Sequence, residues 1–213
     1  MPRYGLDLHQ YFHNCGKCFS DQTVVEIGTS LLSSLQKVHN EGYVYNDLKP
    51  DNILVDYCAK MPKRYYPGNA FKSTSLNLID FGFAQKYRNK DRSHQPRENV
   101  DLFKGNLVFA SRDQLKFKKT SRKDDLESLM YLLIYFLNDG VVLDISHEMV
   151  KSFDDQLTAL KLIKKIKLSA SIDDLCKGGA SKLKPFCREI LKIKYDEEPD
   201  YEKLKNALGA LTR

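Results

Sequence analysis

The segment from Asp124 to Leu137 most strongly constrains how this chain folds, because it would be apolar on nearly every face of a helix. A helix of this kind is stable only when other elements surround it. The 213 residues suffice for one domain with a single core and are too few for two ordinary ones. We therefore expect one unit over residues 1–213, built around this helix.

A second helix is predicted from about Asp21 to Asn40. Ser20 can cap its start, apolar residues recur along it at three- and four-residue steps, and Gly42 follows its end. Beyond it, Pro50 and its polar neighbours cannot continue a helix.

One small β-hairpin is predicted within the otherwise helical chain. Short apolar runs at 53–55 and 76–79 predict its strands, and an extended connection at 56–75 joins them. Residues 80–120 are irregular and polar. Helical patterns then continue to a last helix at 201–211, with breaks at Gly140, Gly178, Gly179 and Pro199. The predicted fold class is therefore mostly α.

Composition excludes several classes of protein. The chain is 42% hydrophobic and 29% charged, which is typical of a globular domain rather than a disordered or repetitive one. Its longest apolar run, Leu129 to Leu137, is far below the ~20 residues that span a membrane, and the start has no signal peptide. Five cysteines without a secretory signal favour reduced thiols. We expect an intracellular, cytoplasmic protein without a membrane partner, and a cytoskeletal or other large assembly is one option within the cytoplasm.

A zinc site at Cys15 and Cys18 with His9 and His13 is disfavoured. One short stretch would have to supply all four ligands, without a second pair of cysteines. Ordinary thiols are favoured instead.

The formal net charge of +6 is concentrated in two basic clusters, 115–123 and 161–167. Such clusters attract phosphate, acidic peptides or nucleic acid. In the second cluster the lysines alternate with apolar residues at helical spacing, which favours a solvated helix face. The first predicts acidic or phosphorylated partner surfaces. Nucleic acid is disfavoured because no recognition module is present.

Two acidic motifs flank the predicted hairpin, DLKPDN at 47–52 and DFG at 80–82. A hairpin brings its two ends together, so Asp47, Asn52 and Asp80 can meet in one site. Phosphoryl transfer needs such a set, because one carboxylate must accept a hydroxyl proton while other oxygens hold magnesium.

In this order, with a strand between them, the motifs resemble the catalytic loop and magnesium loop of protein kinases. Other segments are similar to the casein kinase I family: SRKDDLES (121–128), LCKG (175–178), FCREILKIKYDEEPDY (186–201), YGLDL (4–8), QKYRNKDRSHQPRENVDL (85–102) and FAS (109–111). The resemblance covers nearly the whole chain. It implies a protein-kinase-like C-terminal lobe, a helical bundle whose small β-hairpin is flanked by the catalytic and magnesium loops, with 80–120 as an activation-loop-like segment.

The resemblance implies a role for each residue of the site. Asp47 would be the catalytic base, and Lys49 would contact the transferring phosphate. Asn52 and Asp80 would be the magnesium ligands. Asp125, on the buried helix, would hold the backbone of the catalytic loop.

Two apolar residues would border the nucleotide. Leu54 would lie on the floor of the adenine pocket, and Ile79 would precede the magnesium loop. Met1 falls at about the hinge and no G-x-G-x-x-G occurs, so we expect the N-terminal lobe to be absent. No cofactor is then expected, and ATP and magnesium would bind only if an N-terminal lobe were supplied.

Three departures from the family pattern predict impaired catalysis. Tyr45 and Asn46 stand where the family has His-Arg before the catalytic aspartate. Asn106 replaces a threonine whose hydroxyl contacts that aspartate, and Val108 replaces an anion-binding arginine. An aliphatic side chain cannot hold phosphate as a guanidinium does.

The leading interpretation is a casein kinase I-like pseudokinase that acts as a structural, protein-binding subunit. A protein partner would cover the exposed top of the lobe, including Leu54 and Ile79. Tyr65, Tyr66 and Phe71, between cations in the hairpin connection, are typical of interfaces, although a plain surface loop fits equally well. The alternative is a serine/threonine kinase completed by an N-terminal lobe from another chain or a longer gene product.

Overall fold

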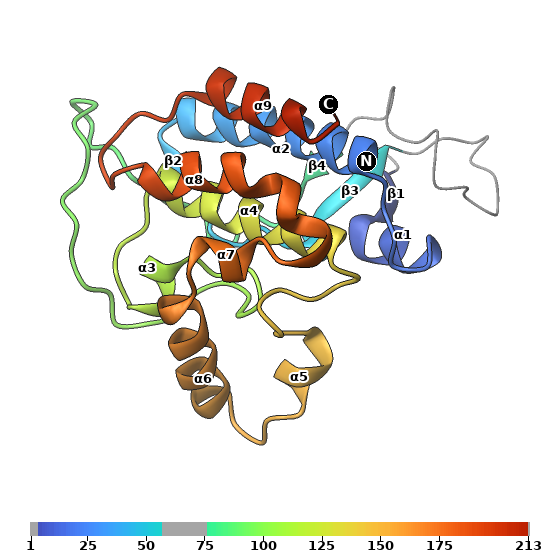
Figure 1. The fold of residues 1–213 in the computed structure, drawn as a ribbon. Coiled ribbons are helices and arrows are strands. Elements are labelled where there is room, and N and C mark those ends of the chain that lie inside the picture. The colour runs from blue at the N-terminus through green and yellow to red at the C-terminus, as the bar shows by residue number, and fades with distance from the viewer. Residues whose placement is uncertain (1–3, 57–75, 213) are drawn as a thin grey trace.

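The protein is described here from a computed structural model, which places residues 4–56 and 76–212. It is mainly helical, as predicted. Four helices pack against one another in its upper part, and two extend below them (Figure 1). The upper helices are α2 (Asp21–Asn40), α4 (Arg122–Leu137), α8 (Lys184–Lys192) and α9 (Tyr201–Gly209), and the lower ones are α5 (His147–Lys151) and α6 (Gln156–Ser169).

Helix α2 has the bounds that its sequence pattern predicts. Ser20 caps it, and the Ser20 hydroxyl accepts a hydrogen bond from the backbone N–H of Thr23 at 3.1 Å. A Cβ atom at Gly28 would lie 2.5 Å from Leu208 Cδ2 and 2.9 Å from Leu133 Cδ1. Glycine at this position therefore lets α9 and α4 approach α2 closely.

Helix α4 runs through the middle of the core, as its all-round apolar pattern predicts. Its side chains are buried from Asp124 to Phe136. The helix starts two residues earlier than predicted. At its start Asp124 Oδ2 accepts a hydrogen bond from the backbone N–H of Ser121 at 2.8 Å, and the Asp124 N–H donates to the Ser121 carbonyl at 3.0 Å.

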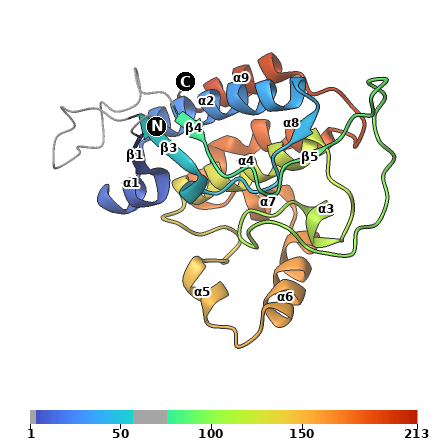
Figure 2. The ribbon, with the colours of Figure 1, turned by 180° about the vertical axis from the view of Figure 1, so that it is seen from behind.

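The predicted hairpin is present, and it belongs to a three-stranded antiparallel sheet. Strand β3 (Ile53–Asp56) pairs with β4 (Leu76–Leu78) and, on its other edge, with β1 (Tyr4–Asp7), which the sequence pattern did not predict. The sheet and α1 (Leu8–Asn14) lie at one end of the domain, best seen from behind (Figure 2).

The remaining elements are short. Strand β2 (Tyr43–Val44), which precedes the 45–52 loop, pairs antiparallel with β5 (Gln85–Lys86), which follows the hairpin in the sequence. The others are α3 (Arg112–Leu115), α7 (Ile172–Leu175) and the 3₁₀ helices η1 (Pro50–Asn52), η2 (Gly178–Leu183) and η3 (Ala210–Thr212). Among the helices in the described part, none is long and apolar enough to cross a membrane.

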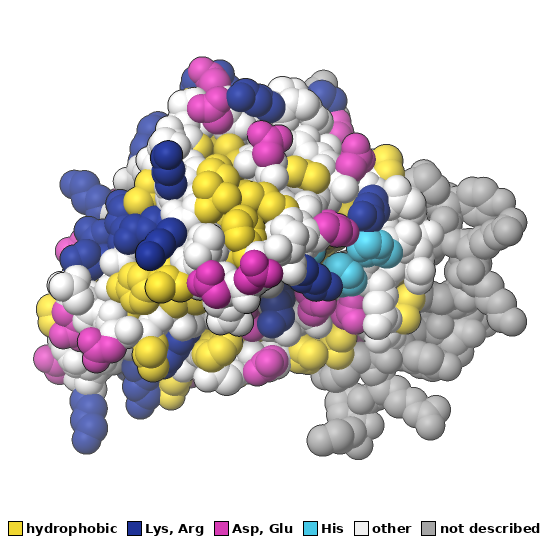
Figure 3. All heavy atoms as spheres, turned by 90° about the horizontal axis from the view of Figure 1, so that it is seen from below, with side chains coloured by type: hydrophobic (Ala, Val, Ile, Leu, Met, Phe, Trp, Pro, Cys, Tyr) yellow, Lys and Arg dark blue, Asp and Glu magenta, His cyan; other side chains and the backbone are white. Residues whose placement is uncertain are grey.

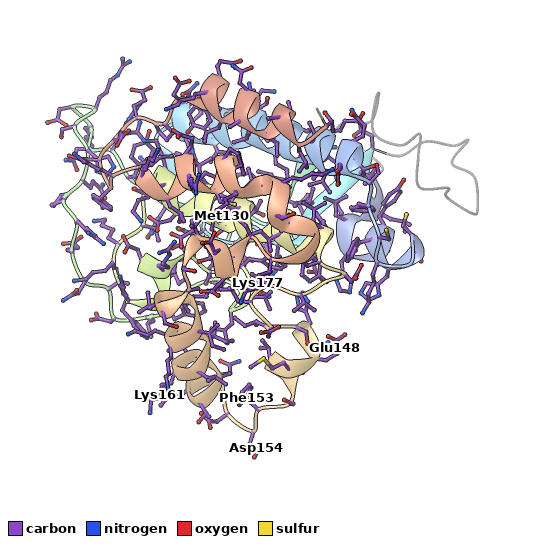
Figure 4. All side chains as sticks on the ribbon, viewed as in Figure 1. Met130, Glu148, Phe153, Asp154, Lys161 and Lys177 are labelled. Carbon is purple, nitrogen blue, oxygen red and sulfur yellow. The ribbon has the colours of Figure 1, made fainter. Side chains whose placement is uncertain are left out.

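The basic cluster on α6 is only partly a solvated face. Lys161 projects away from the domain (Figure 4), but the prediction is wrong for Lys167, which is 1% exposed. Its ammonium nitrogen donates to the carbonyl oxygens of Val108 and Ala110, each at 2.7 Å, and lies 3.9 Å from the centre of the Tyr131 ring. The last turn of α6 therefore faces the core.

Candidate active site

The loop between β2 and η1 contains Asp47. Asp125 of α4 binds the backbone of this loop. The two Asp125 carboxylate oxygens accept hydrogen bonds from the backbone N–H groups of Tyr45 (2.7 Å) and Asn46 (2.8 Å). Asn46 has a φ of +69°, a left-handed conformation that asparagine tolerates better than most residues. A buried carboxylate therefore fixes the peptide groups immediately before Asp47.

Asp47 is 3% exposed, and its two carboxylate oxygens differ. Oδ2 accepts from Asn52 Nδ2 at 2.8 Å and lies 2.9 Å from Lys49 Nζ. Oδ1 is buried and has no hydrogen-bond partner within the described residues. One oxygen is thus held in place while the other keeps an unused acceptor position, which suits a general base.

The segment around Asp80 lies beside Asn52, because the backbone N–H of Ile79 donates to the Asn52 carbonyl at 3.0 Å. Asp80 has a φ of +56°, and its Oδ1 accepts from the backbone N–H of Gly82 at 3.1 Å. The exposed Phe81 ring packs edge-on against the Tyr45 ring, and the two ring centres are 5.2 Å apart. The Tyr45 hydroxyl donates a hydrogen bond to the Ile79 carbonyl. These contacts tie the two loops together.

The donor set here fits magnesium. The amide oxygen of Asn52 and a carboxylate oxygen of Asp80 are the hard ligands that magnesium takes, with phosphates and water completing its shell. In the described part of the chain, no three His, Cys, Asp or Glu side chains gather closely enough to hold a metal ion by themselves.

The other predicted site residues are less well defined. Leu54 on β3 and Ile79 after β4 are half-buried. Tyr65, Tyr66 and Phe71 lie outside the described residues.

Asn46, Asn106 and Val108, the three departures from the family pattern, are uncharged side chains that contact neighbouring parts of the protein. Asn46 donates through Nδ2 to the Phe83 carbonyl at 3.0 Å and accepts from the Thr120 hydroxyl at 2.6 Å. Asn106 Oδ1 accepts from the backbone N–H of Val108 at 2.8 Å, so its amide serves its own loop. Val108 is 1% exposed. These three positions therefore present no cation to a ligand.

Two residues that the sequence reasoning missed support Asp125. His39 Nε2 lies 2.8 Å from Asp125 Oδ2, and His39 Nδ1 lies 2.5 Å from the Tyr201 hydroxyl. Burial raises the pKa of Tyr201, so the phenol stays neutral and can donate. The chain Tyr201, His39, Asp125 links α9 and α2 to the catalytic loop. No short motif marks it, because its members lie far apart in the sequence.

The basic cluster at 115–123 is largely paired within the protein. Lys119 lies 2.5 Å from Glu98, and Lys123 lies 3.0 Å from both Asp113 and Asp124. Arg122 stacks its guanidinium over the Tyr87 ring. Lys116 remains exposed. Most of these cations are thus engaged before any partner binds.

An apolar groove of about 730 Å³ adjoins the catalytic loop. Phe83, Leu102 and Leu157 line it and are 41%, 71% and 57% exposed. Viewed from below, apolar side chains gather in the middle of the face that contains α5 and α6 (Figure 3). The groove reaches Gly105, which has a φ of +115° and whose added Cβ would lie 2.8 Å from the Asn46 carbonyl oxygen.

Residues 4–207 match the protein kinase domain. The chain belongs to the protein kinase family. Casein kinase I homolog 2 of Schizosaccharomyces pombe is 30% identical over 210 residues, which are 98% of this chain and 45% of that protein. The chain is therefore a casein kinase I-like member of this family, and it spans about half the length of this curated relative.

Proposed function

We propose that this casein kinase I-like chain is a catalytically impaired pseudokinase that serves as a protein-binding subunit of a larger cytoplasmic assembly. The observation that carries the proposal is that positions 46, 106 and 108 hold uncharged side chains, Asn46, Asn106 and Val108, which are engaged within the protein. Recognition of an anionic group beside a phosphorylation site needs guanidinium or ammonium groups. Here the corresponding side chains bond to their own loops or are buried.

A protein partner on the cleft side would cover Leu54 and Ile79. Both are half-buried apolar residues, Phe81 two positions after Ile79 is exposed, and apolar groups at a surface are typical of interaction sites. Acidic or phosphorylated surfaces could reach the 115–123 cluster through Lys116. The internal pairing of its other cations argues for a minor contribution.

In this proposal ATP and magnesium bind only when an N-terminal lobe completes the cleft. Asn52 and Asp80 would then hold the metal, and Lys49 would lie near the phosphates. Magnesium would supply charge neutralisation, while Asp47 would orient the hydroxyl group.

A second candidate function, phosphoryl transfer to serine or threonine, is favoured by one specific observation. Asp47 Oδ1 is buried and unpartnered in the described chain, which is where a substrate hydroxyl would donate. In this alternative the lobe is completed by another chain or by a longer gene product.

Thermal unfolding of the purified protein with magnesium and ATP tests the proposal. We expect no rise in melting temperature beyond that of the Asp80→Asn variant, because these 213 residues contain no glycine-rich loop to cover the phosphates. A rise of several degrees that Asp80→Asn abolishes would support the second candidate. Asp196→Asn, away from the catalytic and magnesium loops, is the matched control.

A further inference from the structure

Four cationic side chains surround one hollow beyond the C-terminal end of α2. Lys86, Arg88, Lys90 and Arg92 line this hollow of about 600 Å³, together with Glu41. Lys86, Lys90 and Arg92 are exposed, and Arg88 is half-buried. We name it the basic pocket. None of its lining residues has a role in the candidate active site.

These cations have no counter-ion among the described residues. Across residues 4–56 and 76–212, none of the four lies within ion-pair distance of a carboxylate, whereas surface lysines elsewhere do, such as Lys182 with Asp21 at 2.6 Å. In the same turn, Asp91 Oδ1 accepts hydrogen bonds from the backbone N–H and the hydroxyl group of Ser93. Clustered like charges repel one another, so an entering anion gains from all of them.

The backbone that presents the cations is ordered by pairing. Lys86 pairs with Tyr43 in the β2–β5 ladder, and its ammonium lies 5.7 Å from the centre of the Tyr43 ring. The Tyr87 backbone N–H donates to the Gly42 carbonyl at 3.0 Å. The Arg88 guanidinium lies 5.1 Å from the centre of the Tyr87 ring. These contacts hold two of the cations in place.

The turn that follows is closed by its own hydrogen bonds. The Asn89 backbone N–H donates to the Ser93 carbonyl at 2.9 Å, and the Arg92 backbone N–H donates to the Asn89 carbonyl at 3.1 Å. Arg92 has a φ of +68°. The cations therefore sit on a preformed platform, which lowers the entropy lost when a ligand binds.

We propose that the basic pocket binds a phosphorylated segment of a partner protein, with Arg88 and Arg92 on the phosphoryl group and Lys86 and Lys90 on neighbouring acidic groups. Guanidinium groups hold phosphate oxygens through paired hydrogen bonds, whereas ammonium groups act as point charges.

The shape of the cluster favours a phosphoprotein over nucleic acid. A phosphoserine concentrates about two negative charges on one group. The basic pocket likewise concentrates its cations within seven residues around one hollow, rather than along a stripe that follows a sugar–phosphate backbone. The inference stands apart from catalysis, because an active or an inactive kinase could use this pocket.

Fluorescence anisotropy of the full chain tests the proposal with two labelled pools of random heptapeptides, one with a central phosphoserine and one with serine. We expect the phosphorylated pool to bind at least roughly tenfold more tightly, and Arg88→Gln and Arg92→Gln each to weaken it roughly tenfold. Glu41→Gln should strengthen binding because it removes the opposing charge. Lys161→Gln, an exposed cation on α6, is the matched control (Figure 4).

Equal affinity for the two pools would overturn the proposal. So would a single-stranded RNA that binds more tightly than the phosphorylated pool and is weakened by Arg88→Gln. The proposal also fails if the two arginine variants bind as the control does. Melting temperatures within about a degree of the wild type show that the variants fold, as expected for surface substitutions.

Discussion

Replacing Lys167 by methionine should change how the stability of the protein depends on pH. Burial, the largest cause, lowers the pKa of Lys167 to about 7 in the folded state, against an attraction from Glu127 and with a small repulsion from Arg112. The Tyr131 ring and the carbonyl oxygens of Val108 and Ala110 complete its surroundings.

The direction in which the free energy of unfolding changes with pH follows from proton binding. Between about pH 7 and the ordinary lysine pKa of about 10, the unfolded chain binds a proton at Lys167 and the folded chain does not, so the free energy of unfolding rises with pH. The slope from this one group is on the order of 1 kcal/mol per pH unit. Lys167→Met removes this slope, and it also leaves two buried carbonyl oxygens without a donor.

Urea unfolding followed by circular dichroism at about pH 7.5, 8.5 and 9.5 measures the effect. We expect Lys167→Met to have a lower free energy of unfolding than the wild type at each pH. The difference between the two proteins should grow by roughly 2 kcal/mol over this range. Lys165→Met, exposed on the same helix, should keep the wild-type slope. Parallel slopes for the wild type and Lys167→Met would refute a buried lysine with a lowered pKa.

Two further substitutions test how the core supports the site. Gly28→Ala should destabilise the fold by roughly 1–3 kcal/mol in urea, because its methyl group would press on Leu208, whereas Gly209→Ala has open space and should cost little. Asp125→Asn should destabilise by roughly 2–4 kcal/mol and speed amide exchange at residues 45–47, while the exposed Asp173→Asn should do neither. Unchanged exchange in Asp125→Asn would show that another group holds the loop.

The elements that the sequence predicted have signals within their own residues. Helix α2 has a cap and a regular apolar stripe, and α4 has an all-round apolar pattern. Strand β1 and the β2–β5 pair have no such signal, since short strands form only where a partner strand is available. The burial of Lys167 could not be predicted from its own helix either, because the carbonyl oxygens that accept its hydrogen bonds belong to Val108 and Ala110 in a distant loop.

For the candidate site, sequence order predicted which loops meet but not how their atoms pair. The hairpin places Ile79 against Asn52, so the two motifs lie side by side. The support of Asp125 by His39 comes from 86 residues away. The basic pocket joins the end of α2 to residues 86–95, and no local pattern connects these two segments.

The measurement that most directly tests impaired catalysis is magnesium-dependent phosphoryl transfer from ATP to an acidic casein-type peptide. It compares the native assembly containing wild-type chain with the same assembly containing Asp47→Asn. We expect equal, background rates, because Asn46, Asn106 and Val108 present no cation to a substrate. Transfer by the wild type that falls by roughly a hundredfold or more in Asp47→Asn would contradict the proposal and establish an active kinase.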